Sequence, residues 1–201
     1  HPGLLERYGQ AGRAQCLEDA NYHLSFLADS LNAASPSLFT SYIAWAKVML
    51  TRRGSPVEDL ARNLELTKGA LPEGLPPAES VLALEYVDAA LDGLQALPAD
   101  IPTFLRPEAP QGALARAYLD ALLAGDRHTA TRLVLDAVAS GVPVRDIYLH
   151  VFQPSQYEIG RLWQTNAISV GQEHYCTAAT QMVMSQLYTH VFPTEKSAGT
   201  F

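Results

Sequence analysis

The feature that most limits the folds open to this chain is the spacing of its apolar residues. They recur every three or four positions along nearly every long segment. Such spacing is typical of amphipathic helices, and no segment shows the sustained alternation of β-branched residues that indicates a strand. With 48% hydrophobic and 17% charged residues, the 201-residue chain can build a packed core. The sequence therefore predicts an all-α protein.

Four helices are predicted in the first half of the chain, over about 16–34, 36–53, 55–71 and 76–94. The pairs Ser35-Pro36 and Ser55-Pro56 are typical of helix starts, with serine as N-cap and proline at the first helical position. The periodicity also predicts which side chains are buried. On the first, second and fourth helices these are Leu17, Ala20, Leu24, Leu27 and Leu31; Leu38, Tyr42, Trp45 and Met49; and Leu82, Tyr86, Ala89 and Ala90.

A proline-rich stretch, residues 98–110, is predicted to separate two domains because proline lacks the N–H that a helix needs. An N-terminal helical domain (1–97) precedes it and a four-helix bundle (111–192) follows it. In the bundle, Asp126 is a predicted N-cap, Ser169 and Gln172 form a predicted capping box, and Pro154 is expected to kink a long helix. The bundle core is predicted to include Ala130, Leu133, Val134, Ala137 and Val138. Residues 193–201 are interpreted as the start of a further linker.

Composition excludes several classes of function. The formal net charge is -7, and the largest basic cluster is Lys47 with Arg52 and Arg53, so no nucleic-acid-binding surface is expected. No apolar run approaches the roughly 20 residues that span a bilayer, so no membrane partner is expected. Two cysteines, Cys16 and Cys176, provide no disulfide framework, which fits a cytoplasmic protein. No nucleophile with a paired base and no phosphate loop is present, so the chain is not expected to be an enzyme.

The stretch RLWQTNAISVGQEHYCTAATQ, residues 161–181, contains the strongest candidate site. Trp163 ends one predicted helix and Glu173 and His174 begin the next, so an antiparallel connection brings the three side chains to one end of the bundle. The helix dipole there disfavours imidazolium, and neutral imidazole is the form that binds metals. A single histidine suggests that a macrocycle supplies the other metal ligands. Core packing of the tryptophan and a solvated Glu-His helix start remain the alternative at this point.

The second half of the sequence, about residues 112–192, resembles the helical cap module of cobalamin-binding proteins. A leucine-rich helix runs into a Gly-Asp turn (LDALLAGD), a later helix ends in GRLW, and the next opens with Glu-His. The pattern Trp-x6-Val-x2-Glu-His is similar to that of B12-dependent photoreceptors, which bind adenosylcobalamin. The resemblance implies that Trp163 packs over the upper axial adenosyl group and that Val170 and Glu173 line the same pocket. It also implies that His174 ligates cobalt after light breaks the Co–C bond.

The segment DANYHLSFLADSLNAASPSLFTSYIAWAKVMLTRRG, residues 19–54, resembles the helical region before the cap in photocobilin-like photoreceptors, which pair B12 with biliverdin. The resemblance suggests a bilin slot with Lys47, Arg52 or Arg53 near the propionates. The candidate bilin residues are Tyr22, His23, Tyr42, Trp45 and, from the bundle, His150. For Tyr42 and Trp45 the alternative is ordinary core packing.

The family's α/β cobalamin domain carries a D-x-H-x-x-G motif whose histidine is the lower cobalt ligand, and this sequence has no such motif. We therefore expect that domain as a partner in the intact protein and weak cobalamin binding by this chain alone. The leading hypothesis is a light-sensing chromophore-binding module. The alternatives are the cap of a corrinoid-dependent methyltransferase and a plain helical interaction domain, and self-association into a homo-oligomer is considered for the chain as well.

Overall fold

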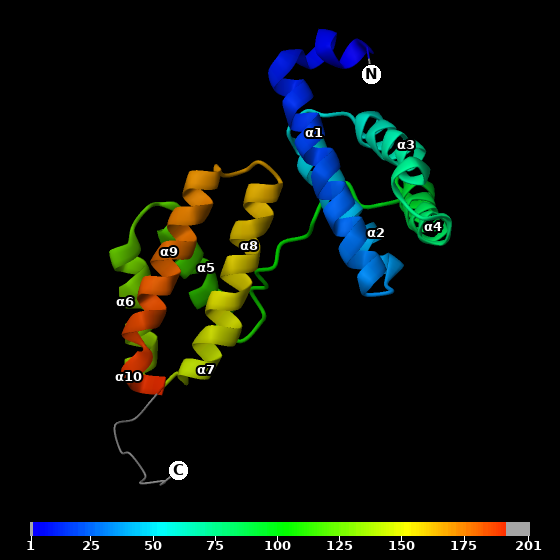
Figure 1. Cartoon of the computed structure of the whole chain (residues 1–201). Helices are drawn as coiled ribbons and strands as arrows, with labels where there is room; N and C mark the ends of the chain where they lie inside the picture. The colour runs from blue at the N-terminus through cyan, green and yellow to red at the C-terminus, as the bar shows by residue number, and fades with distance from the viewer. Residues whose placement is uncertain (1, 192–201) are drawn as a thin grey trace. The chain divides into compact units, whose positions relative to one another are not determined.

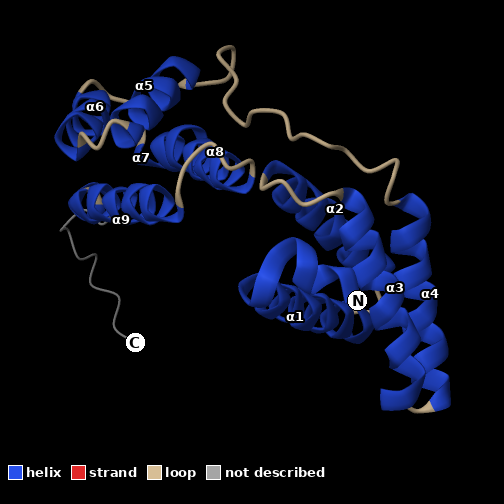
Figure 2. Cartoon of the chain, turned by 90° about the horizontal axis from the view of Figure 1, so that it is seen from above, coloured by secondary structure: helices blue, strands red, loops and turns tan. Residues whose placement is uncertain are grey.

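The computed structural model describes residues 2–191, with side chains from Glu6 onward except those of Thr189 and Val191. The predicted linker start at 193–201 lies outside the described residues. Within the described part the secondary structure is helical and contains no strand, so the all-α fold is confirmed (Figure 1, Figure 2). The chain forms two compact units, residues 1–100 (unit 1) and 101–201 (unit 2). No helix among residues 2–191 is both long and apolar enough to cross a membrane.

Unit 1 packs four helices around a core of aliphatic and aromatic side chains that includes Leu27, Phe39, Ile43, Leu64 and Val87. The helices are α1 (Pro2–Asn32), α2 (Pro36–Arg52), α3 (Val57–Gly74) and α4 (Pro77–Gly93). α1 begins earlier than predicted and is interrupted at Gly9, whose backbone (φ 64°, ψ −167°) is open only to glycine. α3 starts after Pro56 rather than at Ser55.

The predicted buried faces of unit 1 are partly wrong. Leu27 is buried, but Leu17 and Leu24 on the same predicted face are 54% and 42% exposed. Leu38 on α2 and Leu82 on α4 are also exposed. The physical reason is that these helices carry apolar residues on more than one face, while their neighbours cover only one. α4, for example, buries Ser80, Ala83, Tyr86, Val87 and Ala90.

Lys47 on α2 is buried in unit 1 and closes the end of α4. Its Nζ donates hydrogen bonds to the carbonyls of Leu94 (2.8 Å), Leu97 (2.7 Å) and Gln95 (3.3 Å). Carbonyls at the C-terminal end of a helix lack intrahelical partners, and a cation is favoured there. The role of Lys47 in this fold is therefore a helix cap inside the protein, not a surface cation.

Unit 2 is a helix bundle around Tyr118, Leu119, Ile147, Ile159 and Leu187. Its elements are α5 (Gly112–Leu123), α6 (Arg127–Ala139), α7 (Val144–Ile147), η1 (Tyr148–Phe152), α8 (Gln153–Gln164), α9 (Val170–Gln186) and α10 (Tyr188–Val191). On α6 the predicted core residues Ala130 and Val134 are fully buried, and Leu133, Ala137 and Val138 are partly buried. The periodicity therefore identified the buried side of α6 correctly.

The deformation expected at Pro154 takes the form of a π-helical turn. η1 joins α7 to α8 without a break, and the N–H of Gln153 donates to the carbonyl of Tyr148, five residues earlier. In a regular α-helix the ring of Pro154 would press on the carbonyl of His150, and the wider turn relieves that contact.

The segment that follows residue 100 packs on α8 through a buried carboxylate. Glu158 accepts hydrogen bonds from the Phe104 N–H (2.9 Å) and from Nη2 (2.7 Å) and Nε (3.0 Å) of Arg161. Burial by itself raises the pKa of Glu158, but these donors outweigh burial and hold it below its usual value. Part of the predicted linker 98–110 thus belongs to unit 2, where Leu105 is buried in the core.

Candidate functional site

The candidate site lies where α8 ends and α9 begins. The two helices run antiparallel and side by side, joined by a short loop (Figure 1, Figure 2). The predicted capping box is confirmed: the Gln172 N–H donates to Ser169 Oγ (3.2 Å), and the Ser169 N–H donates to Gln172 Oε1 (3.0 Å). Asn166 turns the loop with a positive φ of 60°. This start places Glu173 and His174 in the first two turns of α9.

Glu173 and His174 are in direct contact, as their adjacent positions permit. Glu173 Oε2 pairs with His174 Nδ1, while Glu173 Oε1 lies 3.0 Å from the hydroxyl of Thr177. An ionised carboxylate only accepts hydrogen bonds, so Nδ1 carries the proton. In neutral His174 the lone pair is then on Nε2, and the side chain is 73% exposed. This is the tautomer and the setting that a metal-binding histidine needs.

A path of neighbouring polar side chains leads from Glu173 to the core of unit 2. The Thr177 hydroxyl lies 3.2 Å from Gln156 Oε1 on α8, and Gln156 Nε2 donates to Thr180 Oγ1 (2.8 Å). Thr180 in turn lies 2.9 Å from the hydroxyl of Tyr118, whose pKa burial raises to about 12. Thr177 has one hydroxyl proton for two acceptors, Glu173 Oε1 and Gln156 Oε1, so it donates to one of them at a time, and the partners of Glu173 named here, His174 and Thr177, both lie on α9. Sequence reasoning missed this path, although polar residues at 173, 177 and 180 share one helix face and could have indicated it.

Trp163 and Val170 lie at the same end of this helix pair. Trp163 follows Gln156 by about two turns, so the two share a face of α8, and Val170 precedes Thr177 by the same interval on α9. Trp163 is half-buried and Val170 is 53% exposed. Gly160, one turn before Trp163, is exposed, and a Cβ added there would meet nothing within 4 Å. An aromatic side chain, a small aliphatic one and open space therefore lie at the same end of the helix pair as Glu173 and His174.

No metal cluster supplements His174. Across residues 2–191, no group of three or more His, Cys, Asp or Glu side chains is arranged to hold a metal ion. A metal at His174 would need its remaining ligands from another molecule, and a corrin ring brings four equatorial nitrogens with its cobalt. The donor set fits cobalamin in that respect.

The candidate bilin residues of unit 1 form an aromatic cluster between α1 and α2. His23 Nδ1 lies 2.8 Å from the Tyr42 hydroxyl, and Phe26 and Trp45 stack against Tyr42 at centroid distances of 3.9 and 6.2 Å. His23 and Tyr42 are buried, while Tyr22 and Trp45 are 53% and 37% exposed. Core packing thus explains the position of Tyr42, in agreement with the alternative interpretation from the sequence. It does not explain Trp45, whose side chain is partly exposed.

Burial leaves His23 with an unsatisfied atom. Its Nε2 is buried and has no hydrogen-bond partner, and burial lowers the pKa of the imidazole to about 4. The raised pKa of Tyr42 has the same cause. A partnerless buried ring nitrogen favours a bound molecule near these residues.

The remaining bilin candidates are placed elsewhere. His150 is half-buried on η1 in unit 2, about 20 Å along the helix axis from Trp163. Lys47, proposed to lie near the propionates, is committed to the carbonyls at the end of α4. Arg52 pairs with Asp100 at 3.1 Å, and Arg53 Nη1 donates to the Met49 carbonyl at 3.1 Å.

Comparison with known proteins identifies one family within the chain. Residues 114–188 match the family described as a B12 binding domain. No curated protein matches the chain, and no solved structure matches it. The matched range lies within unit 2 and contains Trp163, Val170, Glu173 and His174. It supports a B12-binding cap module in unit 2 and cobalamin as its cofactor.

Proposed function

We propose that unit 2 covers the upper face of cobalamin with His174 as the cobalt-binding residue, and that the chain is the helical part of a light-sensing protein. The observation that carries the proposal is the Glu173–His174 contact within the matched B12-binding range. It orients the exposed imidazole of His174 at the end of the α8–α9 pair and leaves Nε2 as the nitrogen that can bind a metal.

Each residue of the site has a distinct role in this proposal. Thr177 holds one oxygen of Glu173 so that the other remains on His174 Nδ1. Trp163 and Val170 supply apolar surface against an axial adenosyl group, and Gly160 leaves room for it. Cobalamin supplies a cobalt ion whose upper axial ligand can be exchanged under light.

The wider setting is part of the same proposal. The lower cobalt ligand comes from an α/β cobalamin domain that acts as partner, and adenosylcobalamin is the dark-state cofactor. We expect a cytoplasmic protein with no catalytic activity of its own and no nucleic acid bound by these helices, and self-association is open to test by gel filtration.

A titration with aquacobalamin tests the role of His174. If Nε2 replaces the cobalt-bound water, the cobalamin absorption bands shift on addition of the chain and the shift saturates. His174→Ala is expected to abolish the shift, whereas His128→Ala, which removes an exposed histidine of α6, leaves it unchanged. A shift that persists in His174→Ala would rule out this ligand.

Illumination tests the light-sensing function. The intact protein is mixed with adenosylcobalamin, and its absorption spectrum is recorded before and after green light. We expect a light-formed spectrum that requires His174. Binding without any light-induced change would favour the methyltransferase cap, and no binding at all would favour a plain helical interaction domain.

We also propose that unit 1 binds biliverdin beside the α1–α2 aromatic cluster, on the strength of the partnerless His23 Nε2. A preparation made with biliverdin is expected to show red absorption that co-elutes with the protein in gel filtration. Trp45→Ala should reduce that absorption. Pigment that elutes apart from the protein would refute the proposal.

A further inference from the structure

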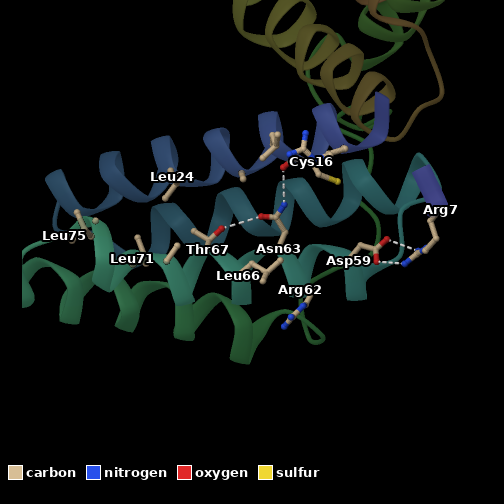
Figure 3. A pocket seen from close by; sticks show the side chains of 15 residues that line it. Arg7, Cys16, Leu24, Asp59, Arg62, Asn63, Leu66, Thr67, Leu71 and Leu75 are labelled. Carbon is tan, nitrogen blue, oxygen red and sulfur yellow. Dashed lines mark hydrogen bonds and ion pairs between the residues drawn. The ribbon is translucent and has the colours of Figure 1, made fainter. Parts of the chain in front are cut away.

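A long groove runs along unit 1 between α1 and α3, with a volume of about 820 Å³ (Figure 3). Its walls are mostly aliphatic. Leu17 and Leu24 on α1 and Leu66 on α3 border it and are 54%, 42% and 48% exposed. Two of them belong to the α1 face that periodicity predicted to be buried. The part of the predicted α1 face that contains Leu17 and Leu24 thus faces an open groove, whereas Leu27 on the same face enters the core.

The groove is elongated because α1 and α3 follow the same direction along it (Figure 3). The lining residues on α3 extend from Asp59 to Leu75, about 24 Å of helix. Ala20 and Ala70 keep the space between the helices open, and Asn63 Nδ2 bridges to the Cys16 carbonyl at 3.4 Å. A slender molecule fits this shape better than a globular one.

The charges of the groove are gathered toward one end. Arg7 and Arg13 lie near the start of α1 and Arg62 near the start of α3, while the far end is lined by Leu71, Gly74 and Leu75. Arg7 is paired with Asp59 through two hydrogen bonds of 2.9 Å, and Arg62 is paired with Glu65. Among the described residues, no hydrogen bond or ion pair involves Arg13. One guanidinium is therefore available to an anion at this end.

We propose that this groove binds a long-chain carboxylate, with its headgroup on Arg13 and its alkyl chain along the leucines. Guanidinium and carboxylate form charge-assisted, often bidentate hydrogen bonds, which explains the polar end. Burying methylene groups against Leu17, Leu24 and Leu66 supplies the affinity. This site is separate from the α8–α9 site and does not depend on the function proposed for unit 2.

Direct binding of fatty acids to the full chain tests the proposal. Radiolabelled palmitate and laurate, each below its micellar concentration, are measured by equilibrium dialysis. We expect saturable binding at about one site per chain. Palmitate should bind more tightly than laurate, by at most roughly fourfold for each additional buried methylene. Absence of saturable binding, or equal affinity for the two chains, would overturn the proposal.

Matched variants locate the binding. Ala70 is exposed and lines the groove, so Ala70→Trp is expected to weaken palmitate binding by roughly tenfold or more without disturbing the core. Ala89→Trp places the same side chain on an exposed position of α4 outside the groove and is expected to have no effect. Arg13→Gln should weaken binding by about threefold, and Arg13→Lys should retain most of it. Palmitate binding unchanged in Ala70→Trp would place the ligand elsewhere and refute the proposal.

Two further results would identify a different occupant. If the chain dimerises in gel filtration with light scattering and Ala70→Trp makes it monomeric, the groove is an interface with a second copy. If the chain sediments with phosphatidylglycerol vesicles and Ala70→Trp abolishes this, the groove binds a membrane lipid. Either result would overturn the assignment to a free carboxylate.

Discussion

The two units differ in how completely their buried polar groups are hydrogen-bonded. In unit 2 each has partners: Glu158 is held by Arg161 and the Phe104 N–H, and Thr180 by Tyr118 and Gln156. In unit 1 the buried Nε2 of His23 has none. The bundle is thus completed by its own residues, and its site consists of a precisely held carboxylate and imidazole on the surface. Unit 1 has an open groove and one unsatisfied buried atom, His23 Nε2, and both fit the proposals that this unit binds a molecule.

The apolar surface follows the same division. Unit 1 exposes Leu17, Leu24 and Leu66 along a groove, and Phe26 and Trp45 beside α2. In unit 2 the α8–α9 face near His174 combines polar residues such as Gln156 and Thr177 with the apolar Trp163 and Val170. A polar site gains specificity from directed hydrogen bonds, whereas an apolar groove gains affinity from area. The comparison leads to three predictions about stability, in which Trp45 reports on unit 1 and Trp163 on unit 2.

The largest effect is expected at the buried ion pair of unit 2. Glu158→Ala leaves Arg161 and the Phe104 N–H without their acceptor, and breaking such a pair costs about 3–5 kcal/mol. Urea unfolding of unit 2, followed by Trp163 fluorescence in a Trp45→Phe background, measures the loss. Glu65→Ala in unit 1 breaks only the exposed pair with Arg62 and should cost about 0.5 kcal/mol or less.

Equal costs for the two variants would contradict the contrast between the units. So would a loss in Glu158→Ala that appears in the Trp45 signal and not in the Trp163 signal, because Glu158 has all its named partners in unit 2.

The second prediction concerns how the stability of each unit changes as the pH is lowered. The folded-state pKa of His23 is about 4 and the usual value is 6.5, so between these values the unfolded chain binds more protons and the stability of unit 1 falls as the pH falls. The expected loss between pH 7 and pH 4 is roughly 3 kcal/mol. Asp19, whose pKa burial raises, offsets part of it at the acid end. Glu158 has a pKa below its usual value of 4.5, in contrast to Asp19. Its contribution to the stability of unit 2 is therefore fully present above pH 4.5 and is lost only as the pH falls below that value.

Urea titrations at pH 7, 5.5 and 4.5, read from Trp45 in a Trp163→Phe background, test this order. His23→Gln cannot titrate and should flatten the pH dependence of unit 1, whereas His128→Gln should not. If unit 2 loses stability before unit 1 as the pH is lowered, the assignment to His23 is wrong.

The sequence predicted unit 2 better than unit 1 for a physical reason. On α6 of the bundle the apolar stripe is covered by neighbouring helices, so periodicity alone found Ala130 and Val134. In unit 1 several helices are apolar on two faces, and periodicity cannot tell whether Leu24 meets the core or a groove. The contact between Glu173 and His174 follows from their adjacency. The path through Gln156 and Thr180 depends on how α8 packs on α9, which local sequence does not encode.

The smallest expected change in stability concerns the N-cap residues of two helices, Ser169 of α9 in unit 2 and Ser35 of α2 in unit 1. Ser169 accepts the Gln172 N–H and completes the capping box of α9, so Ser169→Ala should destabilise unit 2 by about 1 kcal/mol. Ser35 occupies the N-cap position of α2, but its side chain makes no capping hydrogen bond, so Ser35→Ala should change unit 1 by only a few tenths of a kcal/mol. Both serines are predicted N-caps, Ser35 by a Ser-Pro pattern and Ser169 by a capping-box pattern, yet only the Ser169 hydroxyl bonds to the backbone. Urea midpoints from the two tryptophans measure the difference, and a larger loss for Ser35→Ala would show that the pattern, not the bond, determines stability.

Because Ser169 sets where α9 begins, its loss should also weaken the aquacobalamin shift that depends on His174, an effect that Ser35→Ala should not have.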